Sequence, residues 1–198
     1  MDKIRAEHLK TDKAEIRRRV MALREALSGA ERERGKLLLT ERILGHQWFY
    51  RSDTLLGFAS YGSEIDTSEI LKEALRLGKR VYLPRVTEKP ENREMIFLQV
   101  HSLSELQPGY RGIPEPESGA EAYEYREHEA EQALMLMPGA VFDSFRNRIG
   151  YGAGFYDRYL ADKPALQLRT IAVGFRCQMV EKLPFDEHDI RPYQVICV

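Results

Sequence analysis

The chain has 198 residues, with 30 Lys and Arg against 31 Asp and Glu, a formal net charge of -1 and 43% hydrophobic residues. Ordinary apolar content and a net charge near zero exclude a disordered chain, and the length suits one domain with a substantial core. A balanced charge also excludes bulk attraction to nucleic acid or anionic membranes as the main activity.

The first fifty or so residues predict two amphipathic helices. The first would be capped by Thr11 or Asp12 and end at Ser28-Gly29, because apolar residues recur at helical spacing: Ile16, Val20, Leu23 and Leu27. Ser28 and Glu31 have capping-box spacing, so a second helix is expected from there to the segment between Gly45 and Trp48. Residues 1–51 hold 13 basic and 8 acidic residues, a local positive excess in a neutral chain.

The pattern then changes to short apolar runs separated by helical segments. We expect helices at 67–77 and 155–161, and strands at 54–60, 80–83, 94–100, 132–137, 170–175 and 194–198, with Pro84 ending the second strand. Strands that alternate with helices indicate an α/β fold. We therefore predict a three-layer α/β/α sandwich with a mainly parallel, Rossmann-like sheet.

Neither a disulfide framework nor a membrane span is expected. Cys177 and Cys197 belong to no CxxC motif or Cys/His cluster, which also argues against a structural zinc site. The longest nearly apolar run, 133–142, is interrupted by Pro138 and Gly139 and is too short to cross a bilayer. The first thirty residues lack an apolar signal core, so we expect a soluble, cytoplasmic protein with no membrane partner.

The most informative segment is 148–158, which follows a buried strand and precedes a helix. Its alternate glycines, Gly150, Gly152 and Gly154, let backbone N–H groups approach an anion, and the next helix directs its positive end to the same place. The spacing is neither that of a Walker A loop nor that of a GxGxxG fingerprint. A tight turn would also explain the glycines. The nearby Arg146, Arg148 and Asp157 favour a site for an anion and a metal.

Two carboxylates and a row of cations could serve this loop. Mg²⁺ on a nucleotide takes one or two carboxylates plus phosphate oxygens, so Asp157 and Asp189 are candidate ligands, although Asp157 could simply flank its helix. Lys13, Arg17 and Arg24 fall within a narrow arc of the first helix, beside its apolar stripe. They either extend into solvent from a packed helix or reach across to phosphates.

The chain resembles a known family, the 5-formyltetrahydrofolate cyclo-ligases, also called 5,10-methenyltetrahydrofolate synthetases. The similar segments follow one another along nearly the whole chain: KAEIRRRVMALREALS (13–28), SEIDTSEI (63–70), VYLPRV (81–86), MPGAVFD (137–143), RIGYGAGFYDRYL (148–160) and GFRCQMVEKLPFDEHD (174–189). The glycine loop is the most specific of them. Arg146, Ala153 and Phe155 differ from residues common in the family, and we expect activity to be retained.

The resemblance implies an enzyme that uses ATP and Mg²⁺ to convert 5-formyltetrahydrofolate into 5,10-methenyltetrahydrofolate, ADP and phosphate. It implies a single domain over 1–198, a monomer, and small-molecule partners without nucleic acid. The ATP-binding residues that it implies are Lys13, Ala14, Glu15, Ile16, Arg17, Arg148, Ile149, Gly150, Tyr151, Gly152, Ala153, Gly154, Phe155 and Tyr156. Within that set, Arg148 and Lys13 would have catalytic roles.

The resemblance also implies the folate and metal ligands. Folate would contact Glu64 and the loop residues Tyr151, Gly152, Ala153, Gly154 and Phe155, and magnesium would be held by Asp157 and Asp189. Glu64 suits the donor edge of a pterin, although it could instead be a helix-start carboxylate. Arg85 is a candidate for the glutamate carboxylates of folate, and Tyr110, Ile113 and Met95 could wall the pocket or be ordinary packing.

The chemistry agrees with these roles. A formyl amide is a poor electrophile, so its oxygen must take the γ-phosphoryl group and become a leaving group before N10 attacks. Such a reaction needs positioning and charge stabilisation rather than a nucleophilic side chain.

Two other functions fit the same fold. One is a non-catalytic domain that binds nucleotide, folate or RNA, which Ala153, Phe155 and the basic first helix would favour. The other is a sugar-phosphate isomerase or acyl transferase, in which the cations on the ATP side would have no use.

Overall fold

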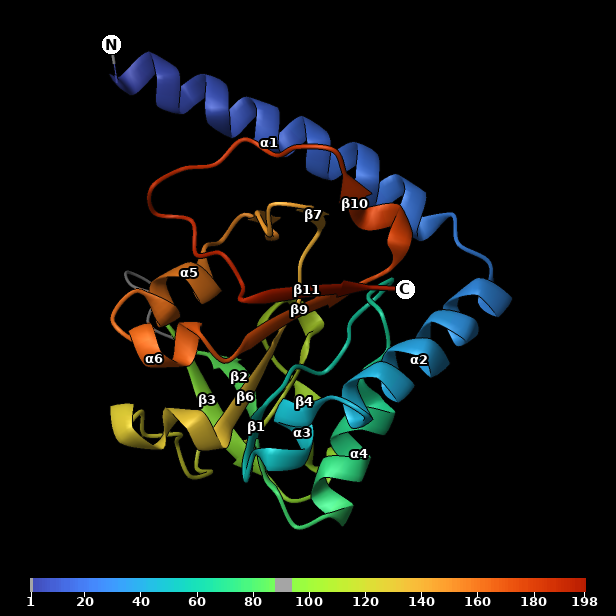
Figure 1. Ribbon diagram of the computed structural model, residues 1–198, viewed down its shortest axis with the longest axis vertical. Helices are drawn as coiled ribbons and strands as arrows, with labels where there is room; N and C mark the ends of the chain where they lie inside the picture. The colour runs from blue at the N-terminus through green and yellow to red at the C-terminus, as the bar shows by residue number, and fades with distance from the viewer. Residues whose placement is uncertain (1, 88–93) are drawn as a thin grey trace.

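The centre of the molecule is a six-stranded sheet in the order β11-β9-β6-β1-β2-β3 (Figure 1). The computed structural model describes residues 2–87 and 94–198. The sheet strands are β1 (Thr54–Leu56), β2 (Arg80–Val86), β3 (Met95–Val100), β6 (Ala133–Met137), β9 (Thr170–Gly174) and β11 (Gln194–Cys197). Every neighbouring pair is parallel except β2 with β3. The predicted mainly parallel α/β fold is therefore confirmed.

Helices cover both faces of this sheet because buried side chains alternate along its strands. On one face, Leu55, Leu134 and Val173 share a core with three helices: α2 (Gly29–Leu44), α3 (Gln47–Arg51) and α4 (Ser68–Arg76). On the other face, Leu56, Met135 and Ala172 pack with α5 (Phe155–Leu160) and α6 (Pro164–Gln167). Two separate apolar clusters thus hold the three layers together.

The first helix, α1 (Asp2–Glu25), lies across the top of the molecule in Figure 1 and covers a second, smaller sheet. That sheet has the order β10-β7-β8, formed by β10 (Met179–Val180), β7 (Val141–Asp143) and β8 (Arg148–Ile149). Ile16 and Val20 of α1 pack against Val141, Ile149 and Leu183. This packing places the polar edge of α1 beside the glycine loop, which begins where β8 ends.

The remaining elements are short. A two-stranded sheet is formed by β4 (Gln107–Pro108) and β5 (Pro114–Glu115). Four 3-10 turns complete the described part of the chain: η1 (Leu103–Glu105), η2 (Tyr110–Gly112), η3 (Glu127–Gln132) and η4 (Arg176–Gln178). Except for η3, these pieces are two or three residues long, too short to show a period in the sequence.

Helix ends were predicted with mixed success. The capping box is confirmed, because the backbone N–H of Ser28 donates to the Glu31 carboxylate at 2.8 Å and the Glu31 N–H donates to Ser28 Oγ at 3.3 Å. The start of α1 at Thr11 or Asp12 is wrong, since the helix already begins at Asp2. Trp48 belongs to the separate helix α3, which is capped by the His46 side chain.

Pro84 lies inside β2 and does not end it. The Tyr82 carbonyl accepts from the Gly57 N–H on the β1 side of the strand. Because orientation alternates along a strand, the Pro84 nitrogen faces that same side, beyond the end of β1. The missing N–H therefore removes no ladder bond, while β2 continues to pair with β3 through Phe97.

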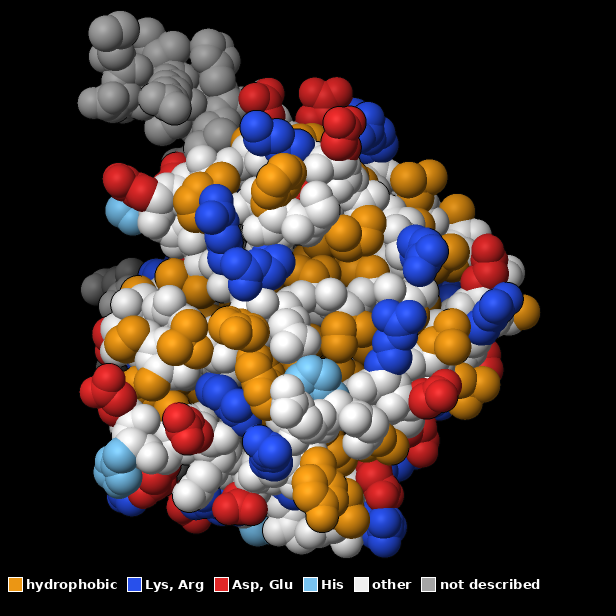
Figure 2. Space-filling view, in the orientation of Figure 1, with side chains coloured by type: hydrophobic (Ala, Val, Ile, Leu, Met, Phe, Trp, Pro, Cys, Tyr) orange, Lys and Arg blue, Asp and Glu red, His pale blue; other side chains and the backbone are white. Residues whose placement is uncertain are grey.

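The surface carries mixed charges. Figure 2 shows a face on which basic, acidic and apolar side chains are interspersed, as expected from a neutral composition. Within residues 2–87 and 94–198, no helix combines the length and apolar character needed to cross a membrane.

Candidate functional site

The glycine loop joins β8 to α5 and requires glycine at two positions. Gly152 has a φ of 101° and Gly154 a φ of 65°, both in the left-handed region that L side chains rarely adopt. A Cβ atom on Gly152 would lie 3.4 Å from Arg17 Nη1. Tyr151, Gly152 and Ala153 remain exposed, so the loop packs against α1 while its backbone stays accessible to a ligand.

The row of cations on α1 faces this loop. Arg17 Nη1 donates to the Gly150 carbonyl at 3.2 Å, and Lys13 pairs with Asp189. Two turns further on from Arg17, Arg24 Nη1 donates to the Tyr151 hydroxyl at 2.7 Å. The interpretation of these residues as solvent-directed side chains is therefore wrong for Arg24, of which only 3% is exposed.

Arg148 is buried and pairs with Asp157. Its Nη2 lies 2.9 Å from Asp157 Oδ1, and its side chain is only 3% exposed. Its Nε and the Tyr156 hydroxyl are both buried and lack hydrogen-bond partners among the described residues. The Arg148 guanidinium lies 5.7 Å from the centre of the Tyr156 ring. Two unpartnered polar atoms thus lie next to the loop, at a place where a bound ligand could satisfy them.

The segments that carry the two predicted metal ligands are joined by a hydrogen bond. Asp157 Oδ1 accepts the backbone N–H of Ile190 at 3.1 Å, and Ile190 directly follows Asp189. Asp189 in turn accepts the N–H of Asp186 at 2.8 Å and pairs with Lys13. No group of three or more His, Cys, Asp or Glu side chains suited to a metal occurs in the described residues.

Glu64 lies on the folate side of the predicted site, in a network with Tyr151 and Arg24. Its Oε2 accepts the Tyr61 N–H at 2.9 Å, and the Tyr151 hydroxyl also bonds to its carboxylate. Burial raises the pKa of Glu64, although these hydrogen bonds and the Arg24 charge oppose that rise. Burial likewise raises the pKa of Tyr151 above its usual range, so this hydroxyl keeps its proton.

These residues surround a narrow cavity that is closed as it stands, with no room for a water molecule. Its walls combine polar groups with flat apolar surfaces: Arg24, Phe58, Glu64, Ile65, Pro138, Gly139, Tyr151, Val173 and Gln178. Tyr151 closes the cavity while 43% of the residue remains exposed. The glycine loop therefore has cation–carboxylate pairs on one side and a closed cluster of polar and apolar groups around Glu64 on the other.

Comparison with known proteins decides the family. The model of the 5-formyltetrahydrofolate cyclo-ligase family matches residues 9–198. The chain belongs to this family. A mouse cyclo-ligase is 30% identical over 191 residues, which cover 93% of this chain and 90% of the mouse protein. An Escherichia coli K12 cyclo-ligase is 31% identical over 84% of this chain and 90% of its own length.

Solved structures of cyclo-ligases share the fold. The 5,10-methenyltetrahydrofolate synthetase of Aquifex aeolicus superposes with a TM-score of 0.74 at 30% identity, covering 91% of this chain and 86% of that one. The Mycoplasma pneumoniae synthetase has a TM-score of 0.69 at 20% identity, covering 93% of this chain and 98% of that one. The second similarity supports the fold alone.

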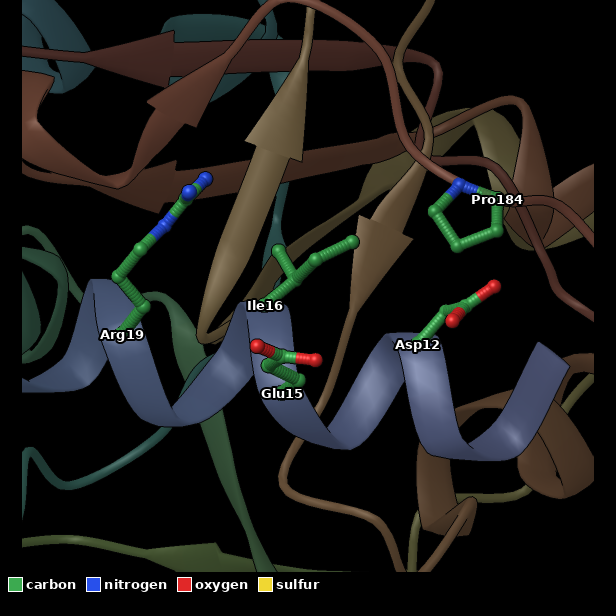
Figure 3. Close-up of a pocket in the computed structure, with 5 residues that line it drawn as sticks. All are labelled: Asp12, Glu15, Ile16, Arg19 and Pro184. Atoms are coloured by element: carbon green, nitrogen blue, oxygen red, sulfur yellow. The ribbon is translucent and has the colours of Figure 1, made fainter. Parts of the chain in front are cut away.

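Some residues predicted from the cyclo-ligase resemblance lie away from the loop. Ala14 and Glu15 are exposed on the outer flank of α1, and Ile16 packs in the apolar cluster beneath the helix. Figure 3 shows Glu15 and Ile16 beside a second cavity, together with Asp12, Arg19 and Pro184. Lys13 and Arg17 thus face the glycine loop, Ile16 packs against Ile149 beside it, and nucleotide contact by Ala14, Glu15 and Ile16 stays a prediction.

The candidate wall residues of the folate pocket separate into two groups. Tyr110 packs edge-on against Phe155, with ring centres 5.9 Å apart, and so borders the loop. Met95 is buried in the core cluster with Phe97, which is the ordinary packing role. Arg85 donates to the Pro116 carbonyl at 2.6 Å, next to the end of β5.

The sequence pattern grouped Arg24 with the predicted phosphate cations and did not indicate its position beside Ser63 and Glu64. Its Nε donates to Ser63 Oγ at 3.0 Å, so it bridges the Ser63-Glu64 turn to the glycine loop. The available signal was helical phase, because Arg24 and Val20 occupy the same buried arc of α1. Helical phase alone does not show whether a long side chain contacts the glycine loop or the Ser63-Glu64 turn.

Proposed function

We propose that the chain catalyses the ATP-dependent ring closure of 5-formyltetrahydrofolate to 5,10-methenyltetrahydrofolate. The observation that carries the proposal is the arrangement of two cation–carboxylate pairs and one glutamate cavity around a single glycine loop. Family membership supports the reaction type, and the site geometry supports the assignment of residues to roles. We further propose that residues 1–198 act as one domain, as a monomer and in the cytoplasm.

Lys13, Arg17 and Arg148 would bind the phosphates of ATP. Before nucleotide arrives, Lys13 and Arg148 are neutralised by Asp189 and Asp157. A bound polyphosphate offers these cations stronger acceptors, and backbone N–H groups of the loop supply uncharged donors. The unpartnered Arg148 Nε supports this role, because phosphate oxygens would satisfy it.

Asp157 and Asp189 suit a magnesium ion that arrives with the nucleotide. Mg²⁺ is held by one or two carboxylates plus phosphate oxygens, so a pair of neighbouring aspartates is the appropriate donor set. When bound, the ion would supply positive charge to the phosphate oxygens. The aspartates would in turn release Lys13 and Arg148 toward the same phosphates.

Glu64 would bind the pterin ring. An ionised carboxylate accepts two parallel hydrogen bonds, which matches the amino group and ring N–H of a 2-amino-4-oxopteridine. Phe58, Ile65 and Val173 line the same cavity and present apolar surface to a flat ring. The loop residues Tyr151 to Phe155 lie between this cavity and the phosphate side, so one loop would contact both substrates.

The reaction follows from this placement. The formyl oxygen attacks the γ-phosphorus of ATP and ADP leaves, so the oxygen carries the phosphoryl group. N10 then attacks the activated formyl carbon and loses its proton, and phosphate departs to give the methenyl bridge. Arg148 and Lys13 would stabilise the charge that develops on the transferring group.

A spectrophotometric assay tests the proposal. The purified chain with 5-formyltetrahydrofolate, ATP and Mg²⁺ should produce the methenyl chromophore, and omission of ATP or addition of a magnesium chelator should abolish it. Failure to form the product at high enzyme concentration contradicts the proposal. Tight binding of folate or nucleotide without turnover would instead favour the non-catalytic binding function.

A further inference from the structure

Arg24 is a buried cation in the same cavity as Glu64, and its hydrogen bonds connect two loops. Only 3% of the residue is exposed, and its bonds go to the uncharged hydroxyls of Ser63 and Tyr151. Within the described residues, no hydrogen bond uses its second amino nitrogen, Nη2. The Glu64 carboxylate lies within Coulombic reach but makes no direct hydrogen bond to this guanidinium, so a stronger direct acceptor is expected when the site is in use.

The Tyr151 hydroxyl links Arg24 to Glu64. It accepts a hydrogen bond from Arg24 Nη1 at 2.7 Å, and it bonds to the Glu64 carboxylate. Arginine can only donate and an ionised carboxylate can only accept, so the tyrosine O–H must donate to Glu64. A single hydroxyl thus presents an acceptor to Arg24 and a donor to Glu64.

The lactam edge of a pterin offers the same two functions side by side. Ring N3–H is a donor, and the adjacent 4-oxo group is an acceptor. We infer that Arg24 determines specificity by donating to the 4-oxo group of the substrate, while Glu64 accepts from N3–H and the 2-amino group. The lactam would replace the Tyr151 hydroxyl, which would leave the cavity as the partly exposed Tyr151 moves with the glycine loop.

The inference rests on the proposed function for the identity of the ring. It adds a residue that recognises the substituent at ring position 4. An analogue with a 4-amino group presents a donor where Arg24 also donates, so it should bind less tightly. Glu64 contributes to the same discrimination, since the 4-amino ring lacks the N3 proton. The contribution of Arg24 is therefore the part of the preference that disappears when only Arg24 is changed.

Equilibrium binding measures the contribution of Arg24 to the preference directly, without catalytic turnover. Dissociation constants for pteroylglutamate and its 4-amino analogue are determined by fluorescence quenching at about pH 7, where both rings are mainly neutral, for the wild type and Arg24→Met. The dissociation constant of the 4-amino analogue divided by that of pteroylglutamate should shrink roughly tenfold in Arg24→Met. This is the effect expected from one hydrogen bond to a charged donor. Arg24→Lys, which keeps a cation, should retain part of the preference.

Two further variants complete the test. Arg18→Met removes an exposed arginine of the same helix and should leave the ratio unchanged. Tyr151→Phe should preserve the preference because Arg24 is still present, and it serves if Arg24→Met fails to fold. An unchanged ratio in folded Arg24→Met, a preference lost in Tyr151→Phe, or no binding of either compound to the wild type would overturn the inference. Lack of methenyl product with the preference intact would contradict the proposed function alone.

Discussion

Each cation that we propose for the phosphates, apart from Arg17, is already paired with a carboxylate that we propose for magnesium. Lys13 pairs with Asp189 and Arg148 with Asp157. Without these counter-charges, three cations would repel one another around the empty loop, and the buried Arg148 would lack compensation. The ion pairs therefore stabilise the ligand-free site. They separate when a nucleotide brings negative phosphates for the cations and a magnesium ion for the carboxylates.

Asp157→Asn tests the Arg148 pair. The change leaves a buried guanidinium without its counter-charge, so we expect a loss of about 1–3 kcal/mol in the free energy of unfolding and a loss of roughly tenfold or more in turnover. Urea denaturation and the methenyl assay measure the two effects. Asp162→Asn is the control, because the Asp162 side chain is 79% exposed and pairs with Lys163 in solvent. Equal behaviour of the two variants would contradict the assignment.

Glu64 should make the protein less stable as pH rises. Burial raises its pKa above the ordinary value of 4.5, so the folded chain binds this proton more tightly than the unfolded chain does. The free energy of unfolding should be at its full value and independent of Glu64 ionisation below about pH 4.5. It should fall as pH rises from there through the raised pKa. Folate affinity should change in the opposite direction, because the pterin needs the ionised carboxylate.

Urea unfolding across this pH range measures the effect of Glu64. In Glu64→Gln the downward slope should be smaller, since the glutamine does not titrate. Glu181→Gln, at an exposed position, should keep the wild-type slope. A slope that persists unchanged in Glu64→Gln would show that another group is responsible.

At the scale of elements, α2 depends on its first turn. Ser28 and Glu31 exchange hydrogen bonds across the helix start, and the Ser28 bonds lower the pKa of Glu31. Ser28→Ala removes one of these acceptors and should cost about 1 kcal/mol of stability, measured by urea denaturation. Ser118→Ala, in an exposed loop, should change stability by less than about 0.5 kcal/mol. Equal losses would argue against the cap.

The glycine loop is an element whose backbone conformation limits its sequence. Gly152→Ala places a Cβ at a φ of 101° and 3.4 Å from Arg17 Nη1, so both strain and crowding should follow. We expect a stability loss of about 1 kcal/mol or more and weaker ATP binding, measured by denaturation and calorimetry. Gly29→Ala is a matched control, because nothing lies within 4 Å of its added Cβ and alanine favours a helix. A neutral Gly152→Ala would contradict the conformational requirement.

At the scale of the whole molecule, the sequence predicted most of the central sheet and little of the small one. The strands β3, β6, β9 and β11 were found within a residue or two because their apolar runs are long and bounded. The predicted strand at 54–60 is too long, since Gly57 and Phe58 are buried but lie beyond the ladder of β1. Burial of a strand appears in the sequence as a run of apolar residues, whereas pairing with a neighbouring strand produces no such local pattern.

The candidate site was predicted by residue type more successfully than by contact. The glycine loop, Lys13, Asp157 and Asp189 come together as expected, yet their present partners are one another. Arg24 could not be assigned, because its two neighbours, Ser63 and Tyr151, come from distant parts of the chain. Such contacts depend on how α1 packs over the small sheet, which no local pattern determines.

A double-mutant cycle tests the contact that spans the molecule. Lys13→Met and Asp189→Asn, singly and combined, should reveal a coupling of about 0.5–1 kcal/mol, because both side chains are partly exposed. The coupling should decline with added salt, since solvent-accessible charges are screened. Thermal or urea unfolding of the four proteins gives this value. A coupling near zero at low salt would mean that the pair adds nothing to stability.

The separation of Lys13 and Asp189, 176 positions along the chain, also has a consequence for biosynthesis. A nascent chain that lacks residues 179–189 offers α1 neither β10, nor Leu183, nor the counter-charge for Lys13. The packing of α1 is therefore complete only after residues 179–189 have been made, although Val141 and Ile149 are available to it earlier. A nascent chain that has not reached residue 189 would thus lack both the complete seat of α1 and the carboxylate that faces Lys13.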